Sequence, residues 1–407
     1  MTTIFNDPAD FAATALAGFC AVHAGQVRPV PGGVVRATAT PRGKVALLVG
    51  GGSGHYPAFA GYVGPGLADA AVAGDVFASP PASRVAGVAR AAHHGGGVIL
   101  GFGNYAGDVM NFGLAARQLK GEGIDVRILA VTDDVVSAPA ERQDMRRGIA
   151  GDLTVFKIAG AAAETGMDLD AVERLGRLAN ARTRSFGVAF SGCTLPGAAQ
   201  PLFSVAPGCM ALGLGIHGEP GIAEQPVVSA AELGALLVAK LVPEAPERPG
   251  NRVAAVLNGL GRTKWDELFV LWTGVAAALQ AAGLEAVDPL VGEFVTSLDM
   301  AGCSLTLMWL DAELEPLWRA PVDTPGLRRG NIAATAPDAV APAAPDHRKP
   351  TGFPPACGES REAGQRIAVL LDALAAAMRD AEAELGGLDA LAGDGDHGQG
   401  MARGSAA

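Results

Sequence analysis

Short apolar stretches that lead directly into glycine-rich or acidic loops limit the possible folds of this chain more than any other part of its sequence. Three occur early: Lys44–Val49 before Gly50–His55, Gly97–Phe102 before Gly103–Asp108, and Val126–Val131 before Asp133-Asp134. Such runs indicate strands buried on both faces, as in parallel sheets. Loops at the carboxyl ends of parallel strands are where α/β proteins bind small ligands. The pattern therefore predicts an α/β fold with a ligand site at these strand ends.

Segments with helical spacing alternate with further strands over the rest of the first 330 residues. The pattern predicts helices at 8–24, 108–123, 153–165, 168–181, 229–241 and 266–282, and further strands at 185–190, 210–216, 252–257 and 304–310. Strands that alternate with helices are typical of α/β units. We expect two α/β subdomains, 1–184 and 185–330, whose loops meet at a substrate cleft.

Composition excludes several classes of function. The net charge of −11 argues against a surface for nucleic acid or anionic membranes. The five cysteines are scattered without a C-x-x-C pair, which suits a reducing compartment and no structural zinc. The first residues do not resemble a signal peptide, and no apolar run reaches the ~18 residues of a membrane span. We therefore expect a cytoplasmic protein with no nucleic-acid or membrane partner.

Two histidines stand in glycine-rich loops. His55 ends the run GGGSGH, and His217 lies in GLGIHGEPG at 213–221. Glycines leave little bulk beside each ring, so a small molecule can approach it closely. Glu219 is near enough in sequence to bond one ring nitrogen of His217 and fix the tautomer of the other. The alternative is that each histidine is a satisfied polar residue in a structural turn.

The same glycine loops do not complete a nucleotide-binding fingerprint. In 50–55 the sixth position is His55 instead of Gly or Ala, and no Walker Gly-Lys-Ser/Thr follows. The pattern G-x-G-x-x-A at 101–106 fits better, but the acidic pair Asp133-Asp134 lies about 30 residues past its second glycine, where ~20 is expected. A nicotinamide-dependent dehydrogenase is therefore a weak interpretation.

Carboxylates occupy two further positions of interest. Asp108 opens a predicted helix, where an acidic side chain can simply cap free N–H groups. Asp389, Asp394 and Asp396 lie within eight residues, between glycines, and such oxygen donors suit Mg²⁺. No glutamate closes a twelve-residue calcium loop there. The alternative for these three residues is a solvated acidic turn.

After Gly330 the composition changes. Residues 331–357 are dominated by alanine and proline, which predicts an extended, semi-rigid linker. Within 358–407, apolar residues then recur on one helical face, and a single amphipathic helix cannot bury that face alone. We expect 358–407 to be an incomplete all-α unit. The residues of this face are Ile367, Leu370, Leu371, Leu374, Met378, Ala381 and Leu385.

Several motifs together resemble the dihydroxyacetone (glycerone) kinase family. They are GGGSGHYP at 50–57, GNYAGD at 103–108, RRGIAGD at 146–152, GLGIHGEPG at 213–221 and TSLDMAG at 296–302. The resemblance runs in order through 1–330, which would be the ketose-binding domain. The tail at 358–407 resembles the opening of that family's nucleotide-binding domain, including its L-x-x-x-x-GDGDHG metal loop. Linker and tail together resemble the fused, ATP-dependent form, with the nucleotide domain truncated.

The resemblance implies roles for individual residues. His217 would bond covalently to the substrate carbonyl carbon and give a hemiaminal, since a neutral imidazole nitrogen is a competent nucleophile. Asp108 would act as general base on the terminal hydroxyl that receives phosphate, with His55 hydrogen-bonding the substrate or stabilising charge. The expected substrate-binding residues are Gly52, Ser53, Gly54, Tyr56 and Ser79. The expected ligands of Mg²⁺, which would bridge the ATP phosphates, are Asp389, Asp394 and Asp396.

Two departures from the family bear on the substrate. Tyr56 stands where glutamate is common, and Gly103 stands where some members have lysine. Both change the pocket rim, so a four-carbon ketose such as erythrulose becomes an alternative to dihydroxyacetone.

A second hypothesis is a ketose-binding or sensing module that transfers no phosphate by itself. The family resemblance also implies a homodimer and leaves room for a separate nucleotide-binding subunit. Because the nucleotide domain is incomplete in this sequence, we expect the chain to need such a domain for turnover.

Overall fold

The computed structural model describes residues 2–219, 221–332, 357–390, 393 and 395–406. The chain divides into two compact units, Met1–Asp338 and Ala339–Ala407. The larger unit contains two large β-sheets, and the smaller unit is helical. Most of the predicted linker at 331–357 lies outside the described residues.

The first sheet has six strands in the order β1-β2-β4-β3-β5-β6. Strands β3 to β6 are parallel, and the β1–β2 hairpin pairs antiparallel with β4. Because β4 and β5 flank β3 on opposite sides, the loops that follow them diverge at the carboxyl end of β3, where open α/β sheets bind ligands. The strands are β1 Val27–Val30, β2 Gly33–Arg36, β3 Ala46–Ser53, β4 Ala70–Val76, β5 Val98–Gly103 and β6 Val126–Val131.

Alternating side chains of this sheet enter two different cores. Leu48 and Leu100 pack with α2 (Ala82–Ala92) and α3 (Ala106–Gly121). Leu47 and Ile99 point to the other face, towards α4 (Gly151–Glu164) and α5 (Leu169–Ala181). Successive residues of a strand face opposite sides, so helices on both faces require apolar residues at every position. This explains the continuous apolar runs in the sequence.

The second sheet has seven strands, in the order β11-β10-β13-β7-β8-β9 with β12 beside β10. Helices α6 (Ala230–Leu241) and α7 (Trp265–Ala281) cover one of its faces through a core of their own. The capping box formed by Ser229 and Glu232 begins α6. The strands are β7 Thr183–Ala189, β8 Cys209–Leu212, β9 Ala223–Pro226, β10 Arg252–Gly259, β11 Glu285–Ala286, β12 Leu290–Gly292 and β13 Gly302–Trp309.

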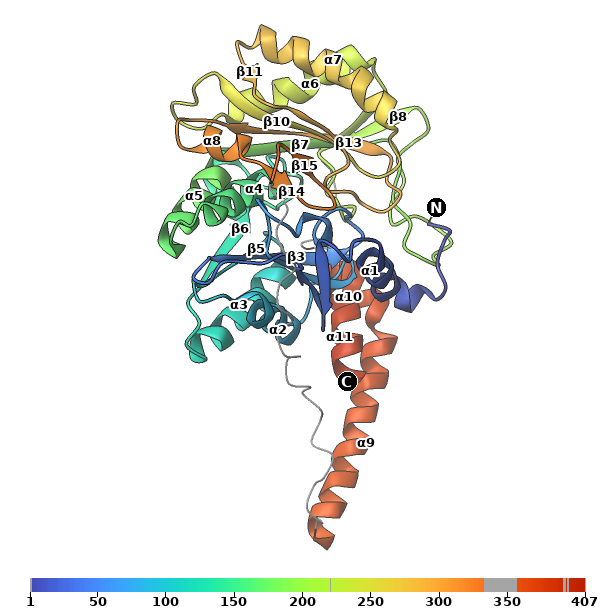
Figure 1. Cartoon of the computed structure of the whole chain (residues 1–407). Helices are drawn as coiled ribbons and strands as arrows, with labels where there is room; N and C mark the ends of the chain where they lie inside the picture. The colour runs from blue at the N-terminus through green and yellow to red at the C-terminus, as the bar shows by residue number, and fades with distance from the viewer. Residues whose placement is uncertain (1, 220, 333–356, 391–392, 394, 407) are drawn as a thin grey trace. The chain divides into compact units, whose positions relative to one another are not determined.

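Helix α4 lies between the two sheets, as Figure 1 shows, and contacts β3, β5 and β6 as well as β7 and β13. Its residues are buried all round from Gly151 to Ala163. Helix α8 (Leu314–Arg319) also packs against α4, and the short hairpin β14–β15 (Val322–Asp323 and Arg328–Arg329) follows it. Because one core joins both sheets, their positions relative to each other are fixed by packing.

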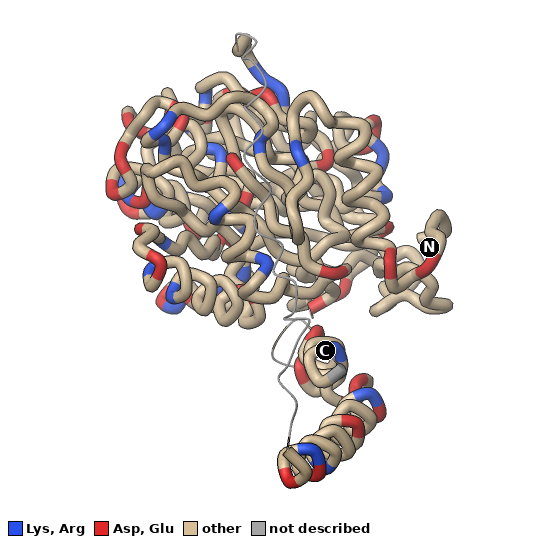
Figure 2. Tube along the Cα trace, turned by 60° about the horizontal axis from the view of Figure 1, so that its bottom comes forward, with Lys and Arg blue, Asp and Glu red and all other residues tan. Residues whose placement is uncertain are grey.

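The remaining described elements of the larger unit are short or peripheral. Helix α1 (Phe11–Val22) follows a 3₁₀ turn η1 (Pro8–Asp10), and further 3₁₀ turns are η2 (Ala60–Tyr62), η3 (Ala140–Met145) and η4 (Val242–Glu244). Acidic and basic residues are interspersed along the trace of this unit in the view of Figure 2.

The predicted α/β class is confirmed, including the all-helical character of the tail. The predicted strand 210–216 is shorter than expected, because β8 ends at Leu212 and Gly213 turns the chain at a φ of 71°. The two expected subdomains each contain one large sheet, and the boundary between them at 184 and 185 stays a prediction.

The smaller unit consists of α9 (Gly358–Asp380), α10 (Glu382–Asp389) and α11 (His397–Ala406). Ile367, Leu370 and Leu374 of α9 are 56%, 68% and 47% exposed. Helix α9 thus presents apolar side chains to its surroundings, as the sequence pattern predicted. No helix in the described part of the chain is long and apolar enough to cross a membrane.

Candidate active site

The candidate site is built from loops that leave the two sheets. The loops after β3, β4 and β5 contribute His55, Ser79 and Asp108. The second sheet contributes the turn after β8, which carries His217, and the segment before β13, which carries Thr296. The sheets are held together by a common core, so these loops meet in a defined geometry.

His55 and His217, 162 residues apart in sequence, are in direct contact: their Nε2 atoms lie 3.1 Å apart. Nδ1 of His55 donates to the carbonyl oxygen of Thr296 at 2.7 Å. Nδ1 of His217 lies 3.1 Å from Oε1 of Glu219, whose other oxygen accepts the His217 backbone N–H at 2.9 Å. Glu219 therefore bonds one ring nitrogen of His217, as the sequence spacing predicted.

These contacts fix the number of protons on the two rings. The carbonyl of Thr296 only accepts, so Nδ1 of His55 carries a proton, and the Glu219 carboxylate likewise requires a proton on Nδ1 of His217. A hydrogen bond between the two Nε2 atoms then needs a third proton. The pair of imidazoles thus holds one positive charge beside the negative charge of Glu219.

Electrostatics place that third proton on His217. Burial, together with the charge of His217, lowers the pKa of His55 to about 3, so His55 is neutral near pH 7. Burial alone would raise the pKa of Glu219, but His217 and Arg147 lower it to about 2. Arg147 lies 3.8 Å from Glu219 and also binds Asp134 at 3.0 Å. The site therefore combines a neutral His55 with a charged Glu219 carboxylate, on either side of His217.

Three rings surround His217. The centroids of His55, Phe77 and Tyr105 lie 4.9, 5.1 and 4.7 Å from its centroid, at interplanar angles of 81°, 78° and 83°. Edge-to-face arrangements at these distances are favourable for aromatic pairs. The ring of His217 is thereby held in one orientation in a mostly apolar setting.

Asp108 and Ser79 form a second polar pair. The Ser79 hydroxyl donates to Oδ1 of Asp108 at 2.6 Å, and Nδ2 of Asn111 lies 3.2 Å from the same hydroxyl oxygen. Helix α3 begins at Ala106 after Tyr105, so Asp108 is in the first turn, not at the cap as the sequence suggested. Tyr105, which precedes α3 and lies three residues before Asp108, packs its ring edge-on against His217.

The predicted substrate-binding glycines line the turn that leads to His55. A Cβ atom on Gly52 would lie 2.8 Å from Cα of Phe77, so only glycine fits there. Gly54 has a φ of 103°, and its carbonyl accepts the N–H of Leu298 at 2.9 Å. Between them, the Ser53 hydroxyl donates to the carbonyl of Gly74 at 2.7 Å, which ties it to the sheet.

The side chain of Tyr56 lies beside helix α1. Its side chain is 52% exposed, and its ring meets Phe19 of α1 edge-on at 5.9 Å. Its backbone carbonyl accepts the hydroxyl of Thr296 at 2.9 Å. The sequence placed Tyr56 at the pocket rim, and the structure gives it a packing role beside that rim.

Four residues of this site were not singled out in the sequence analysis: Phe77, Tyr105, Asn111 and Thr296. Tyr105 and Thr296 belong to motifs singled out for other residues, GNYAGD and TSLDMAG, and Phe77 lies two residues before Ser79. A carbonyl ligand such as that of Thr296 leaves no side-chain signal in a sequence. Asn111 lies three residues after Asp108, on the same helical face, and this spacing was the available signal.

The predicted metal ligands lie in the smaller unit. Oδ2 of Asp389 accepts the N–H of His397 at 3.2 Å, and a Cβ on Gly393 would lie 2.4 Å from Oδ1 of Asp389. Gly393 therefore lies close to this carboxylate, and carboxylate oxygens are donors that a hard cation such as Mg²⁺ prefers. Asp394 lies outside the described residues, and no group of three or more metal-ligating side chains occurs among those the structure describes. The metal site stays a prediction.

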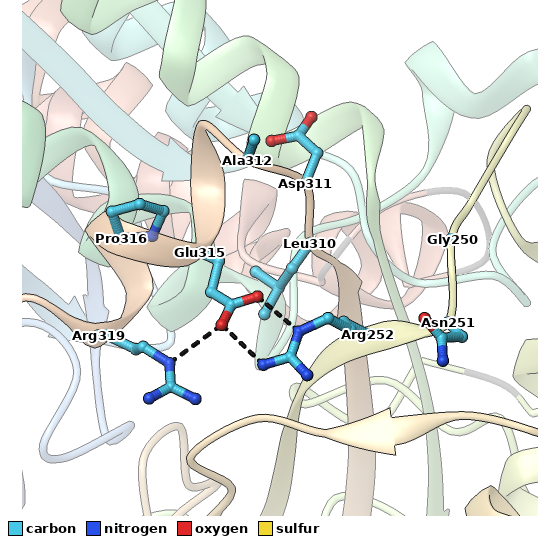
Figure 3. Close-up of a pocket in the computed structure, with 9 residues that line it drawn as sticks. All are labelled: Gly250, Asn251, Arg252, Leu310, Asp311, Ala312, Glu315, Pro316 and Arg319. Carbon is cyan, nitrogen blue, oxygen red and sulfur yellow. Dashed lines mark hydrogen bonds and ion pairs between the residues drawn. The ribbon is translucent and has the colours of Figure 1, made fainter.

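A cavity of about 580 Å³ lies apart from the histidines, between the start of β10 and helix α8. Figure 3 shows that Glu315 bonds both Arg252, at 2.7 Å, and Arg319, at 3.2 Å. The guanidinium groups of Arg252 and Arg319 thus already share the Glu315 carboxylate, and an anionic ligand would have to displace this carboxylate. The chemistry of the molecule points to the histidine site instead.

Known proteins resemble the chain over its whole length. Residues 17–326 match the Dak1 domain. A Mycolicibacterium smegmatis protein named D-erythrulose kinase is 55% identical over 413 residues, which cover 100% of this chain and 71% of that protein. The dihydroxyacetone-binding subunit of the Escherichia coli PEP-dependent dihydroxyacetone kinase is 38% identical, over 81% of this chain and 100% of that subunit. The structure of the C. freundii dihydroxyacetone kinase in complex with AMP-PNP and Mg²⁺ aligns with a TM-score of 0.74 at 33% identity, over 100% of this chain and 74% of that one.

These likenesses, with the α/β fold and the two-histidine site, define the chain as a phosphotransferase of the kinase type. It belongs to the dihydroxyacetone kinase family. The family resemblance of the motifs in 1–330 is thereby confirmed, and the assignment of 358–407 to a truncated nucleotide-binding domain stays a prediction.

Proposed function

We propose that the protein phosphorylates a short-chain ketose that it holds covalently on His217. The observation that carries this proposal is the contact of His217 with a neutral His55 on one side and with Glu219 on the other. A ring whose Nδ1 is bonded to a carboxylate has a nucleophilic Nε2 once the proton on that atom is removed. His55 is in place to remove it.

The third proton on the two rings is the one that the new hydroxyl of the hemiaminal needs. As Nε2 of His217 bonds to the ketose carbonyl carbon, its proton passes to Nε2 of His55, which hands it on in the same step and stays neutral overall. The π electrons of the C=O bond move to oxygen, which takes the proton from His55. The product is a hemiaminal with one N–C bond and one new hydroxyl, and the positive charge stays on the His217 ring opposite Glu219. Glycerol has no carbonyl and is excluded.

Asp108 would serve the transfer step. Its carboxylate already accepts a hydrogen bond from Ser79, so it can accept the proton of a substrate hydroxyl in the same position. The deprotonated oxygen attacks the terminal phosphorus of ATP, and ADP leaves. When bound, Mg²⁺ would neutralise phosphate charge, and Asp389, Asp394 and Asp396 are the residues proposed to hold it.

Erythrulose is the first candidate substrate, and dihydroxyacetone is the second. The D-erythrulose kinase relative supports this order. Gly103 supports it as well, because it adds no side chain beside Tyr105, whose Cε2 lies 3.2 Å from where a Cβ would be. Tyr56 is not a reason to prefer either ketose, because its ring packs on Phe19.

The proposal is tested by calorimetry and crystallography with dihydroxyacetone, D-erythrulose and L-erythrulose, and with glycerol as control. Continuous density between Nε2 of His217 and the ligand carbonyl carbon is expected, as is no binding of glycerol. A ketose held only by hydrogen bonds would refute the covalent step. A strong preference for the three-carbon ketose would reverse the order of the substrates.

Phosphoryl transfer is tested separately by coupled ADP release, with the chain alone and with an added intact nucleotide-binding partner. Turnover with the partner supports the kinase. Ketose binding without turnover under both conditions supports the alternative, a binding or sensing module. Titration of the chain with Mg²⁺, comparing Asp389→Asn and Asp396→Asn with Asp380→Asn on α9, tests the metal loop. We also propose a homodimer, which sedimentation at several protein concentrations checks.

A further inference from the structure

Phe77 follows β4 in a backbone conformation that is uncommon for an aromatic residue. Its φ is 57°, in the left-handed region, where bulky side chains are strained. Its N–H donates to the carbonyl of Ser53 at 2.9 Å. Gly52 and Gly54 make room for it, because a Cβ on either would lie within 2.9 Å of a Phe77 atom. Such strain persists only where the surroundings enforce it, and it marks positions with a specific task.

The ring of Phe77 touches both histidines. It stacks on His55 with centroids 4.9 Å apart and planes inclined by 19°, and it meets His217 edge-on at 5.1 Å. It is 7% exposed. A stacked ring on one face of His55 restrains its rotation and keeps water from that face, while Thr296 holds its Nδ1.

Phe77 also joins the two sheets at this point. It follows the end of β4 in the first sheet, yet the other buried members of the small core in which it packs all lie between residues 189 and 300, in or beside the second sheet. In an ordinary strand conformation the ring of Phe77 would point in another direction. The left-handed backbone at this residue therefore directs the ring towards the second sheet. The other buried members are Ala189, Cys193, Leu260 and Met300.

We propose that Phe77 is a positioning residue that sets the geometry between His55 and His217 by anchoring the His55 loop in the core of the second sheet. The two histidines lie on different sheets, and a hydrogen bond between them requires registration to a few tenths of an ångström. The consequence for ketose binding rests on the function proposed above. The consequence for the two rings does not.

The test removes the ring in two ways. Phe77→Leu keeps an apolar side chain, and Phe77→Gly also relieves the left-handed backbone, so at least one variant should fold. The matched control is Phe186→Leu, which removes a fully buried ring from β7 on the α6/α7 side of the second sheet. All three should lower the melting temperature or leave it unchanged, which a structural role alone also predicts.

The deciding measurement is an NMR pH titration of the histidine ring protons, with crystal structures of the variants. In the wild type and in Phe186→Leu, His55 should not titrate between pH 5 and 8. In both Phe77 variants it should titrate in this range, and the Nε2–Nε2 hydrogen bond should be lost. A silent His55 and an intact contact in both variants would overturn the proposal.

Ketose affinity is the second readout. It should fall at least tenfold in the Phe77 variants and change less than twofold in Phe186→Leu. If the wild type binds no ketose but its histidines respond as expected, the proposed function fails and the positioning role stands. If ketose binds covalently but the Phe77 variants bind it as well as the wild type, the positioning role fails.

Discussion

Gly215 and Glu219 are packed so closely that a Cβ atom on Gly215 would lie 2.1 Å from Oε2 of Glu219. The carboxylate that holds His217 therefore occupies the space where any other residue would have a side chain. The glycine-rich loop is a cradle for this carboxylate as much as an opening for a ligand. The loop geometry and the chemistry of His217 cannot be varied independently.

Gly215→Ala should displace the Glu219 carboxylate and release Nδ1 of His217. Ketose affinity should then fall by about tenfold or more, a loss of at least ~1.4 kcal/mol in binding free energy. Calorimetry with erythrulose measures it. Gly18→Ala on α1, where a Cβ meets nothing within 4 Å, is the control and should bind normally. Equal binding by both variants would show that Glu219 is dispensable.

The stability of the protein should fall as pH falls from about 6.5 towards 3. Folding lowers the pKa of His55 from 6.5 to about 3, so in this window the unfolded chain binds a proton that the folded one does not. The contribution of His55 is a slope of up to about 1.4 kcal/mol per pH unit. Urea unfolding at several pH values tests it. His55→Gln should flatten the curve, and an unchanged slope in this variant would contradict the prediction.

Asp108→Asn should separate binding from transfer. Removing a general base typically costs a factor of about 10² to 10⁴ in rate. The amide can still hydrogen-bond, so ketose affinity should stay within about threefold of the wild type. Steady-state ADP release with a nucleotide-binding partner and calorimetry give the two values. Asp170→Asn, in the exposed first turn of α5, is the control. Retained turnover would exclude Asp108 as the base.

Lys157 is a buried cation that the proposed chemistry does not use. Its Nζ donates to the carbonyl of Leu317 at 2.9 Å, and burial, with the nearby Arg329, lowers its pKa to about 7. Between pH 7 and 10.5 the unfolded chain holds a proton that the folded chain lacks, so this residue makes stability rise with pH there.

Lys157→Met should therefore stabilise the protein at pH 7 and flatten this rise. The gain should be about 1–3 kcal/mol, because the unpaired carbonyl of Leu317 offsets part of it. Unfolding by urea at pH 7 and 9.5 provides the measurement. Lys240→Met on the exposed side of α6 should change neither value. A destabilised Lys157→Met would mean that the lysine hydrogen bond outweighs its burial.

Local pattern was sufficient for most of the elements. The strand predicted at Val126–Val131 is observed with the same bounds, and the helix predicted at 266–282 is observed as Trp265–Ala281. Apolar runs and helical periodicity are encoded within a few consecutive residues, so they can be recognised without the tertiary structure. The turn at Gly213 cut a predicted strand short, because a single left-handed glycine overrides the propensity of the residues after it.

The α/β class, the glycine loops, the family and the two histidines of the site, His55 and His217, could all be recognised in the amino-acid sequence. The contact between these two rings depends on the tertiary structure, because residues 162 positions apart come together through a core common to both sheets. The tertiary structure also places Tyr56 against Phe19 and Phe77 against both histidines. Contacts of this kind depend on how two sheets pack, and no periodicity within either segment records that packing.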